Sequence, residues 1–391
     1  RLMEELPRVS SLDVPVPETS GKSFKSSQVD RLYGYNRIFF KGRLIGGPDI
    51  WRSGCTFLMI FVPSVLWYVE IGVFIAEQVN LAVVVTLVPL LQLSPLVLLL
   101  TTSFCDPGIV PRQKAPIATF DKASQSYRTK PPPKHMEVLL AGRLTKLKWC
   151  VTCNIYRPPR CTHCAVCDNC IERFDHHCPW IGNCIGKRNY RSFFGFLVTV
   201  AILNAFVFVT STMHFSSTCR DLLDQDDSMS KGTAVWNALG DSFTTALLLL
   251  YSVAMGWFTS GMVLYHSYLV YTNQTTYEAV KGAFDGRMNP YSRGAQENCQ
   301  QSLCGSVRPR YFDPRREQLY WPYSRSSTRS GAIPAVTLNR YLPQLTRRTG
   351  SGAEPIAKQG DGSLATAGDG LTSQTTQLES TSEFSLSVDA R

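Results

Sequence analysis

The residues with the clearest chemical potential lie between positions 150 and 184, which hold eight cysteines and three histidines. Structural zinc prefers four thiolate or imidazole ligands, often from Cys-x2-Cys pairs, so two such sites would use eight of these side chains. The eight that suit this task are Cys150, Cys153, His163, Cys164, Cys167, Cys170, His177 and Cys184. Cys161, His176 and Cys178 are then left over. A free cysteine beside a free histidine indicates a nucleophile and its base.

Four apolar stretches must position this cluster. They cover residues 54–76, 81–102, 193–212 and 241–271. About 20 mostly apolar residues cross a hydrocarbon core as a helix, so each stretch is long enough to span a membrane. Buried helices of a soluble fold are the alternative, but four such lengths rarely occur together there. We therefore predict an all-α polytopic membrane protein with four transmembrane helices and a small zinc-stabilised cytosolic cysteine-rich domain, at about residues 148–193, between helices 2 and 3.

The charge distribution predicts an orientation. The net charge is +10, and the segment 103–192 carries 15 of the 40 Lys and Arg residues, whereas the loop between the third and fourth spans carries only Arg220 and Lys231. Basic loops favour the cytosolic side, so we expect both termini and the cysteine-rich segment in the cytosol and residues 213–240 in a lumen. Cytosolic thiols are kept reduced, which favours metal binding or catalysis over disulfides. The basic flanks favour the lipid bilayer as a partner over nucleic acid.

The remaining segments differ in composition. Residues 31–53 mix aromatic and basic side chains, which predicts an interfacial segment before the first span. Residues 1–30 and residues 327–391 are polar and poor in large apolar side chains, so both are predicted to be disordered. Residues 272–326 carry short motifs and are expected to form a cytosolic C-terminal region.

The cysteine-rich segment has a specific spacing. From Cys150 to Phe193 it is Cys-x2-Cys-x9-His-Cys-x2-Cys-x2-Cys-x4-Asp-His-His-Cys-x5-Cys-x4-Asn-x3-Phe. This pattern resembles the DHHC family of protein S-acyltransferases (palmitoyltransferases), and every position of that family's cysteine-rich pattern is present. The resemblance covers about residues 31–305, because it extends to Asp106-Pro107-Gly108, Thr275-Thr276-Tyr277-Glu278, and Asn289-Pro290-Tyr291-Ser292 with Asn298. RPPRCTHC, GRLIGGPD and Cys304-Gly305 look most like the subgroup that includes Ras-palmitoylating and plant and protist enzymes.

The resemblance implies two structural zinc ions as cofactors. One would be held by Cys150, Cys153, His163 and Cys170, and the other by Cys164, Cys167, His177 and Cys184. A small polar unit without a large apolar core needs such structural metal sites, because metal binding supplies folding free energy.

The resemblance also assigns the chemistry to three neighbouring residues. Cys178 would be the nucleophile, His176 its base, and Asp175 the group that orients the histidine. The implied reaction transfers palmitoyl from acyl-CoA to cysteine thiols of membrane-associated proteins through an acyl-enzyme on Cys178. In this family the acyl chain enters a cavity formed by all four helices.

Further residues receive supporting roles from the resemblance. Trp180 and Leu203 are expected to contact the acyl chain, and the medium-sized Leu203 suits palmitate. Arg157 and Arg160 are expected to bind the CoA phosphates, since guanidinium groups bind phosphate bidentately; a solvated, lipid-facing surface is the equally weighted alternative. The expected supports of the catalytic loop are Thr275, Thr276, Glu278 and Asn298. The first three alternatively form only a helix cap.

Two other functional classes compete with the acyltransferase. A non-catalytic zinc-binding membrane adaptor, or a RING-like ligase module, would have no use for the uncommitted Asp-His-Cys. A metal transporter would need liganding side chains inside the spans, which are nearly free of them. We therefore expect a palmitoyltransferase of Golgi or endoplasmic reticulum membranes, with the plasma membrane and endosomes as alternatives. Some members of the subgroup need a small accessory subunit, which is a possible partner here.

Overall fold

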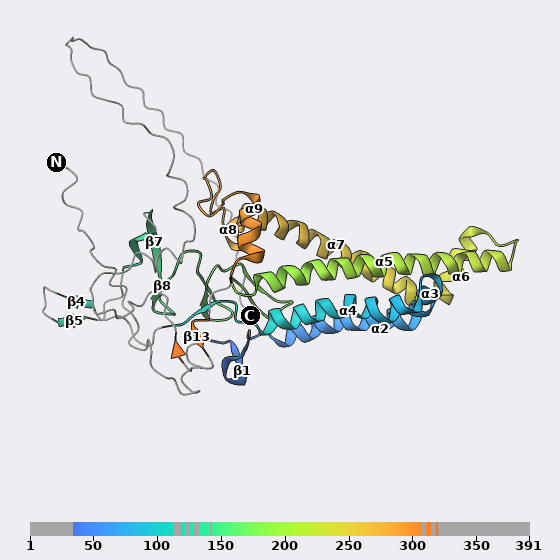
Figure 1. Cartoon of the computed structure of the whole chain (residues 1–391), viewed down its shortest axis with the longest axis horizontal. Helices are drawn as coiled ribbons and strands as arrows, with labels where there is room; N and C mark the ends of the chain where they lie inside the picture. The colour runs from blue at the N-terminus through green and yellow to red at the C-terminus, as the bar shows by residue number, and fades with distance from the viewer. Residues whose placement is uncertain are drawn as a thin grey trace, which may run out of the picture. The chain divides into compact units, whose positions relative to one another are not determined.

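The computed structural model of the chain describes residues 34–112, 119–121, 126–128, 133–140, 143–306, 310–313 and 318–319. The predicted disorder of residues 1–30 and 327–391 lies outside these ranges. Within them, four long apolar helices dominate and lie side by side (Figure 1). They are α2 (Trp51–Glu70), α4 (Leu81–Phe104), α5 (Tyr190–Gln225) and α7 (Phe243–Thr272). The four predicted spans are thereby confirmed as helices long and apolar enough to cross a membrane.

The helix ends differ from the predicted limits. The stretch 54–76 is not one helix, because the chain turns at Ile71 between α2 and a short α3 (Gly72–Gln78). The third helix continues to Gln225, well past residue 212, and the connection that follows it contains a further helix, α6 (Lys231–Asp241). Residues 213–240, predicted as a loop, are therefore largely helical: α6 packs against α5, and hydropathy alone does not detect a helix that continues into a polar environment.

The core of the helical part lies along α5. One face of this helix, including Phe196, Val200 and Leu203, is buried, and α5 packs against both α4 and α7. Trp67 of α2 is fully buried and its indole N–H donates to the Thr210 hydroxyl, 2.8 Å away, which satisfies the polar atom of a large apolar side chain. Much of the outward surface of α2, α4 and α7 is apolar, as a lipid-facing surface requires.

Short antiparallel strands build the rest of the structure. The cysteine-rich segment contains β8 (Ile155–Tyr156), β9 (Thr162–Cys164), β10 (Asn169–Ile171), β11 (His176–Cys178) and β12 (Asn183–Ile185). Before it come β1 (Arg37–Phe39), β2 (Leu44–Gly46), β3 (Ile109–Val110), β4 (Thr119–Asp121), β5 (Ser126–Arg128), β6 (His135–Leu140) and β7 (Arg143–Cys150). After α7 come α8 (Thr276–Val280), α9 (Ala295–Cys299), a π-helical turn (Gln300–Cys304), β13 (Phe312–Asp313) and β14 (Gln318–Leu319).

Asn183 joins three of these parts. Its side-chain amide is fully buried and donates to the carbonyls of Ile45, in the β1–β2 hairpin, and Ser103, at the end of α4. Its side-chain oxygen accepts from the backbone N–H of Cys184 on β12. One amide thus satisfies buried backbone groups that no regular ladder could reach, and it fixes the cysteine-rich segment to the helix end.

We expect Asn183→Ala to lower the free energy of unfolding by about 1–3 kcal/mol, because it leaves buried carbonyls without a donor. The matched control is Asn237→Ala on the outer face of α6, where the side chain is exposed. Thermal unfolding in detergent, followed by intrinsic fluorescence, measures both. Equal melting temperatures for the two variants would contradict the role given to Asn183.

Candidate functional site

The cysteine-rich segment folds into two clusters of potential metal ligands. Each offers three thiols and one imidazole whose ligand atoms lie within 4.8 Å of one another, a donor set and spacing that suit a four-coordinate metal ion. The two sets are Cys150, Cys153, His163, Cys170 and Cys164, Cys167, His177, Cys184. These are the sets expected from the sequence. Cys161 belongs to neither, and its side chain is buried beside the first.

Strand pairing explains how the ligands meet. On β9 and β10, His163 lies directly opposite Cys170, and on β11 and β12, His177 lies directly opposite Cys184. Strand pairing in each hairpin therefore places an imidazole beside a thiol without the help of a metal ion. Carboxylates lie behind both imidazoles: Asp168 is 3.5 Å from Nε2 of His163, and Asp49 is 3.6 Å from Nε2 of His177. Such partners orient ligating histidines in metal sites.

The alternation of side chains along β11 separates binding from chemistry. Successive residues of a strand point to opposite faces, so His176 and Cys178 share one face while His177 points to the other. His177 joins the second cluster, and both His176 and Cys178 line a cavity between the helices. The three-residue strand therefore supplies a ligand on one side and two reactive groups on the other.

Asp175 holds the imidazole of His176. Its carboxylate is 1% exposed and lies 2.6 Å from Nδ1 of His176. Thr276, at the start of α8, donates to the same carboxylate through its backbone N–H at 2.9 Å and its hydroxyl at 2.8 Å. Thr276, in the segment after α7, thereby holds the Asp175 carboxylate, and this carboxylate in turn orients His176.

The electrostatics of this pair favour a protonated imidazole. Burial by itself lowers the pKa of His176, but its hydrogen bonds to Asp175 and Cys178 raise that pKa to about 9. Burial also acts to raise the pKa of Asp175, yet the contacts with His176 and Thr276 keep it below its usual value. An imidazole this basic beside a thiol favours the state in which the thiol's proton has already moved to the ring, which leaves a thiolate as the nucleophile.

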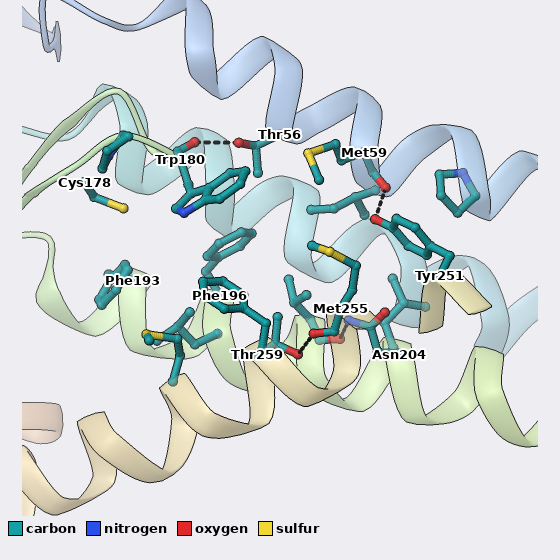
Figure 2. Close-up of a pocket in the computed structure, with 18 of the residues that line it drawn as sticks. Thr56, Met59, Cys178, Trp180, Phe193, Phe196, Asn204, Tyr251, Met255 and Thr259 are labelled. Carbon is teal, nitrogen blue, oxygen red and sulfur yellow. Dashed lines mark hydrogen bonds between the residues drawn. The ribbon is translucent and has the colours of Figure 1, made fainter. Parts of the chain in front are cut away.

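An apolar cavity of about 310 Å³ opens from this face of β11. Figure 2 shows the Cys178 thiol and the Trp180 indole at one end of the cavity, and Tyr251 with Met59 at the other. Leu203 is buried and also lines the cavity. Cys178, Trp180 and Leu203 thus line one cavity, as expected.

The cavity walls come from fewer helices than expected. Among the described residues, the lining side chains belong to α2, α5, α7, β11 and the loop after β11, and α4 contributes none. At the far end, Pro63 has no N–H for the carbonyl of Met59, four residues earlier, and the Tyr251 hydroxyl of α7 donates to that carbonyl at 2.6 Å instead. The carbonyl left without a helical partner by Pro63 is therefore used for a hydrogen bond between α2 and α7.

The two arginines expected near CoA have different environments. Arg160 is nearly buried and makes a bidentate pair with Glu278, at 2.7 and 2.6 Å. It also donates to Asn273 and lies over the ring of Tyr291, 4.5 Å from its centroid. These partners occupy its guanidinium, so Arg160 supports the frame and does not present a free phosphate site. Arg157 keeps a partly exposed side chain whose Nε has no hydrogen-bond partner among the described residues.

The segment after α7 acts both as a helix cap and as a contact to the site. Thr275 and Glu278 form a reciprocal capping box at the start of α8, while Thr276 contacts Asp175. The motif therefore makes both a helix cap and a contact with Asp175. Asn298 is fully buried and donates to the carbonyl of Tyr271, which fixes α9 to the end of α7.

Sequence reasoning missed several residues of this frame. Arg173 donates to Asn273 and Ser302, and Asn273 itself adopts a left-handed conformation at the end of α7. His266 of α7 lines the cavity beside His176. A lone histidine in an apolar stretch was a signal for His266; Arg173 and Asn273 gave none.

We expect Arg160→Met to destabilise the protein by about 3–5 kcal/mol, because it leaves the Glu278 carboxylate buried without its partner. The double variant Arg160→Met with Glu278→Gln removes that charge and should recover part of the loss. Thermal unfolding of the two variants provides the comparison. A double variant no more stable than Arg160→Met would contradict the buried pair.

Comparisons with known proteins agree with this geometry. The sequence pattern of the DHHC palmitoyltransferase family matches residues 144–283. Probable protein S-acyltransferase 7 of Arabidopsis thaliana is 35% identical over 315 residues, which cover 77% of this chain and 69% of the relative. Palmitoyltransferase ZDHHC18 of Homo sapiens is 37% identical over 295 residues, which cover 72% of each chain. The chain therefore belongs to the DHHC family of palmitoyltransferases.

Proposed function

We propose that this protein S-palmitoyltransferase takes its acyl group from acyl-CoA and carries it as a thioester on Cys178 before passing it to cysteine thiols of membrane-associated proteins. One observation carries the proposal: His176 and Cys178 share the face of β11 that opens into the apolar cavity between the helices. An adaptor would leave this arrangement without a role. The names of the relatives, acyltransferases and palmitoyltransferases, also favour the enzyme.

The first step forms the acyl-enzyme. His176 accepts the Sγ proton of Cys178, and the thiolate attacks the thioester carbon of the acyl-CoA. The tetrahedral intermediate collapses, the bond to the CoA sulfur breaks, and the CoA thiolate takes the proton back from His176. Asp175 keeps the imidazole oriented throughout, with Thr276 holding the carboxylate.

The second step reverses these roles. The thiol of a protein substrate loses its proton to His176 and attacks the thioester on Cys178. The new thioester forms on the substrate, and the Cys178 thiolate leaves and is reprotonated. The acyl chain lies in the cavity against Trp180 and Leu203, so only the thioester needs to reach the cytosolic surface.

The groups around the cavity have secondary roles in this proposal. Arg157 is the better candidate for a contact with the CoA phosphates, because the guanidinium of Arg160 is already occupied. Thr275 and Glu278, which cap α8, and Asn298, which bonds to the end of α7, support the catalytic loop indirectly by fixing these helices. We place the cysteine-rich segment and both termini in the cytosol, with residues 213–240 in a lumen, in Golgi or endoplasmic reticulum membranes. A small accessory subunit is a further possible partner.

We also propose that both ligand clusters hold structural Zn²⁺. Three thiols and one imidazole are the soft and borderline donors that zinc prefers, and each cluster is closed by its own four ligands. The ligands hold β9–β12 in place, and His177 fixes β11. The metal would therefore shape the site without taking part in acyl transfer.

The nucleophile is tested by feeding membranes an alkyne analogue of palmitate and measuring hydroxylamine-sensitive labelling. We expect Cys178→Ser to lose labelling of the catalytic peptide and transfer to proteins, because a serine hydroxyl is a poor nucleophile without a strong base. Cys219→Ser, outside the cysteine-rich segment, is the matched control and should label like the wild type. Mass spectrometry must identify the peptide, since Cys299 and Cys304 are exposed thiols. Transfer by Cys178→Ser at the wild-type rate would exclude Cys178 as the acyl carrier.

The metal assignment is tested by elemental analysis of purified protein. We expect two zinc ions per chain, one fewer in Cys153→Ser, and no change in Cys161→Ser, whose thiol belongs to neither cluster. Chelators should remove the metal only together with folded structure, because structural zinc supplies roughly 10–16 kcal/mol of apparent binding free energy. Protein that is active and folded without zinc would overturn the assignment.

A further inference from the structure

A second imidazole lies beside the reactive residues, and the mechanism above does not use it. His266 of α7 is 2% exposed, and its ring centroid lies 6.0 Å from that of His176. The cavity that receives the acyl chain is lined by His266, His176 and Cys178 together. An imidazole in such an apolar wall is costly to bury unless its nitrogens have a use.

The His266 ring is held in a fixed orientation. Its Nδ1 lies 3.2 Å from the hydroxyl of Tyr190, at the start of α5. The ring of Phe193 packs edge-on against both histidines, with centroids 5.0 Å from His266 and 5.3 Å from His176. Its other nitrogen, Nε2, has no hydrogen-bond partner among the described residues.

Five polar side chains of the cavity have a hydrogen-bond partner already. Their hydroxyl or amide groups donate to backbone carbonyls, of another segment for Thr56 and Tyr251 and of the preceding turn for the others; they are Thr56, Ser64, Asn204, Tyr251 and Thr259. His266 differs from these five in combining a ring held by Tyr190 with a nitrogen that has no hydrogen-bond partner among the described residues. Attack on a thioester places negative charge on the carbonyl oxygen, which needs a donor in a water-poor site.

We propose that the Tyr190 hydroxyl donates to Nδ1 of His266, leaving the ring proton on Nε2, and that this Nε2–H donates to the carbonyl oxygen of the acyl thioester as Cys178 attacks it. Tyr190 is then a positioning residue that fixes the tautomer, and His266 is a catalytic residue. This inference rests on the proposed acyl-enzyme.

A hydrogen bond from His266 does not change the proton transfers of the acylation step described above. As the bond from Sγ of Cys178 to the acyl carbon forms, the carbonyl π electrons move to oxygen, and His266 stabilises the oxyanion without giving up its proton. The electrons return as the bond to the CoA sulfur breaks, and the CoA thiolate takes its proton from His176. The same donor serves the second step, in which the attacking sulfur belongs to the protein substrate.

The test compares two reactions of the same thiol. Acylation by palmitoyl-CoA passes through an oxyanion, whereas alkylation by iodoacetamide does not, and mass spectrometry of the Cys178 peptide follows both. We expect His266→Leu to slow acylation by about 10²–10³-fold, the usual effect of losing one oxyanion donor. In His266→Leu, the rate of alkylation of Cys178 and the affinity for the S-hexadecyl thioether of CoA should stay at wild-type values.

Tyr190→Phe keeps the ring and removes only the hydroxyl, so it tests the orientation of His266 with little risk to folding. We expect acylation to fall about tenfold, the equivalent of one hydrogen bond, with alkylation unchanged. The matched control is Ser267→Ala, next to His266 on the exposed face of α7, which should behave like the wild type in both reactions.

Each alternative result has a distinct meaning. If His266→Leu or Tyr190→Phe slows acylation and alkylation equally, His266 acts through the nucleophile and the oxyanion role is wrong. If both variants acylate at the wild-type rate, His266 has no part in the reaction. Failure of the wild type itself to acylate Cys178, with normal alkylation, would instead reject the proposed acyl-enzyme.

Discussion

The strand β11 is the constraint on which the rest of the site depends. Its middle residue, His177, belongs to a ligand cluster on one side, and the flanking His176 and Cys178 face the cavity on the other. Pairing with β12 sets His177 opposite Cys184, so the hairpin and the cluster fix the same strand. The ligand cluster thus determines where His176 and Cys178 point, and in the proposed mechanism it takes no part in the chemistry.

A second set of contacts ties this strand to the helices. Asp175 precedes β11 and is held by Thr276, which follows α7 in sequence. The pair of Arg160 with Glu278 makes a parallel connection between the same two segments. The carboxylate that orients the base is therefore positioned by residues about a hundred positions away. A shift of the C-terminal end of α7 would therefore move Thr276 and Asp175, and with them the imidazole of His176.

The cavity separates an apolar interior, which suits an acyl chain, from the water that surrounds CoA. Its walls are apolar side chains of α2, α5 and α7, and the polar groups within it are mostly bonded to nearby carbonyls. Burial of an acyl chain there and retention of CoA in water are compatible only if the thioester lies at the boundary. Cys178, at the cytosolic end of the cavity in the proposed orientation, meets that condition (Figure 2).

The sequence by itself determined the four membrane helices, because they depend on local hydropathy, and the spacing of the cysteines and histidines, from which family resemblance implied the two ligand sets and the roles of Asp175, His176 and Cys178. Family resemblance predicted that Trp180 and Leu203 contact the acyl chain, and both side chains line the cavity. Only the tertiary structure decided that Arg160 pairs with Glu278, that α4 does not line the cavity, and that His266 and Tyr190 meet beside His176. Those contacts join residues far apart in sequence, and helix packing, which no local period encodes, brings them together.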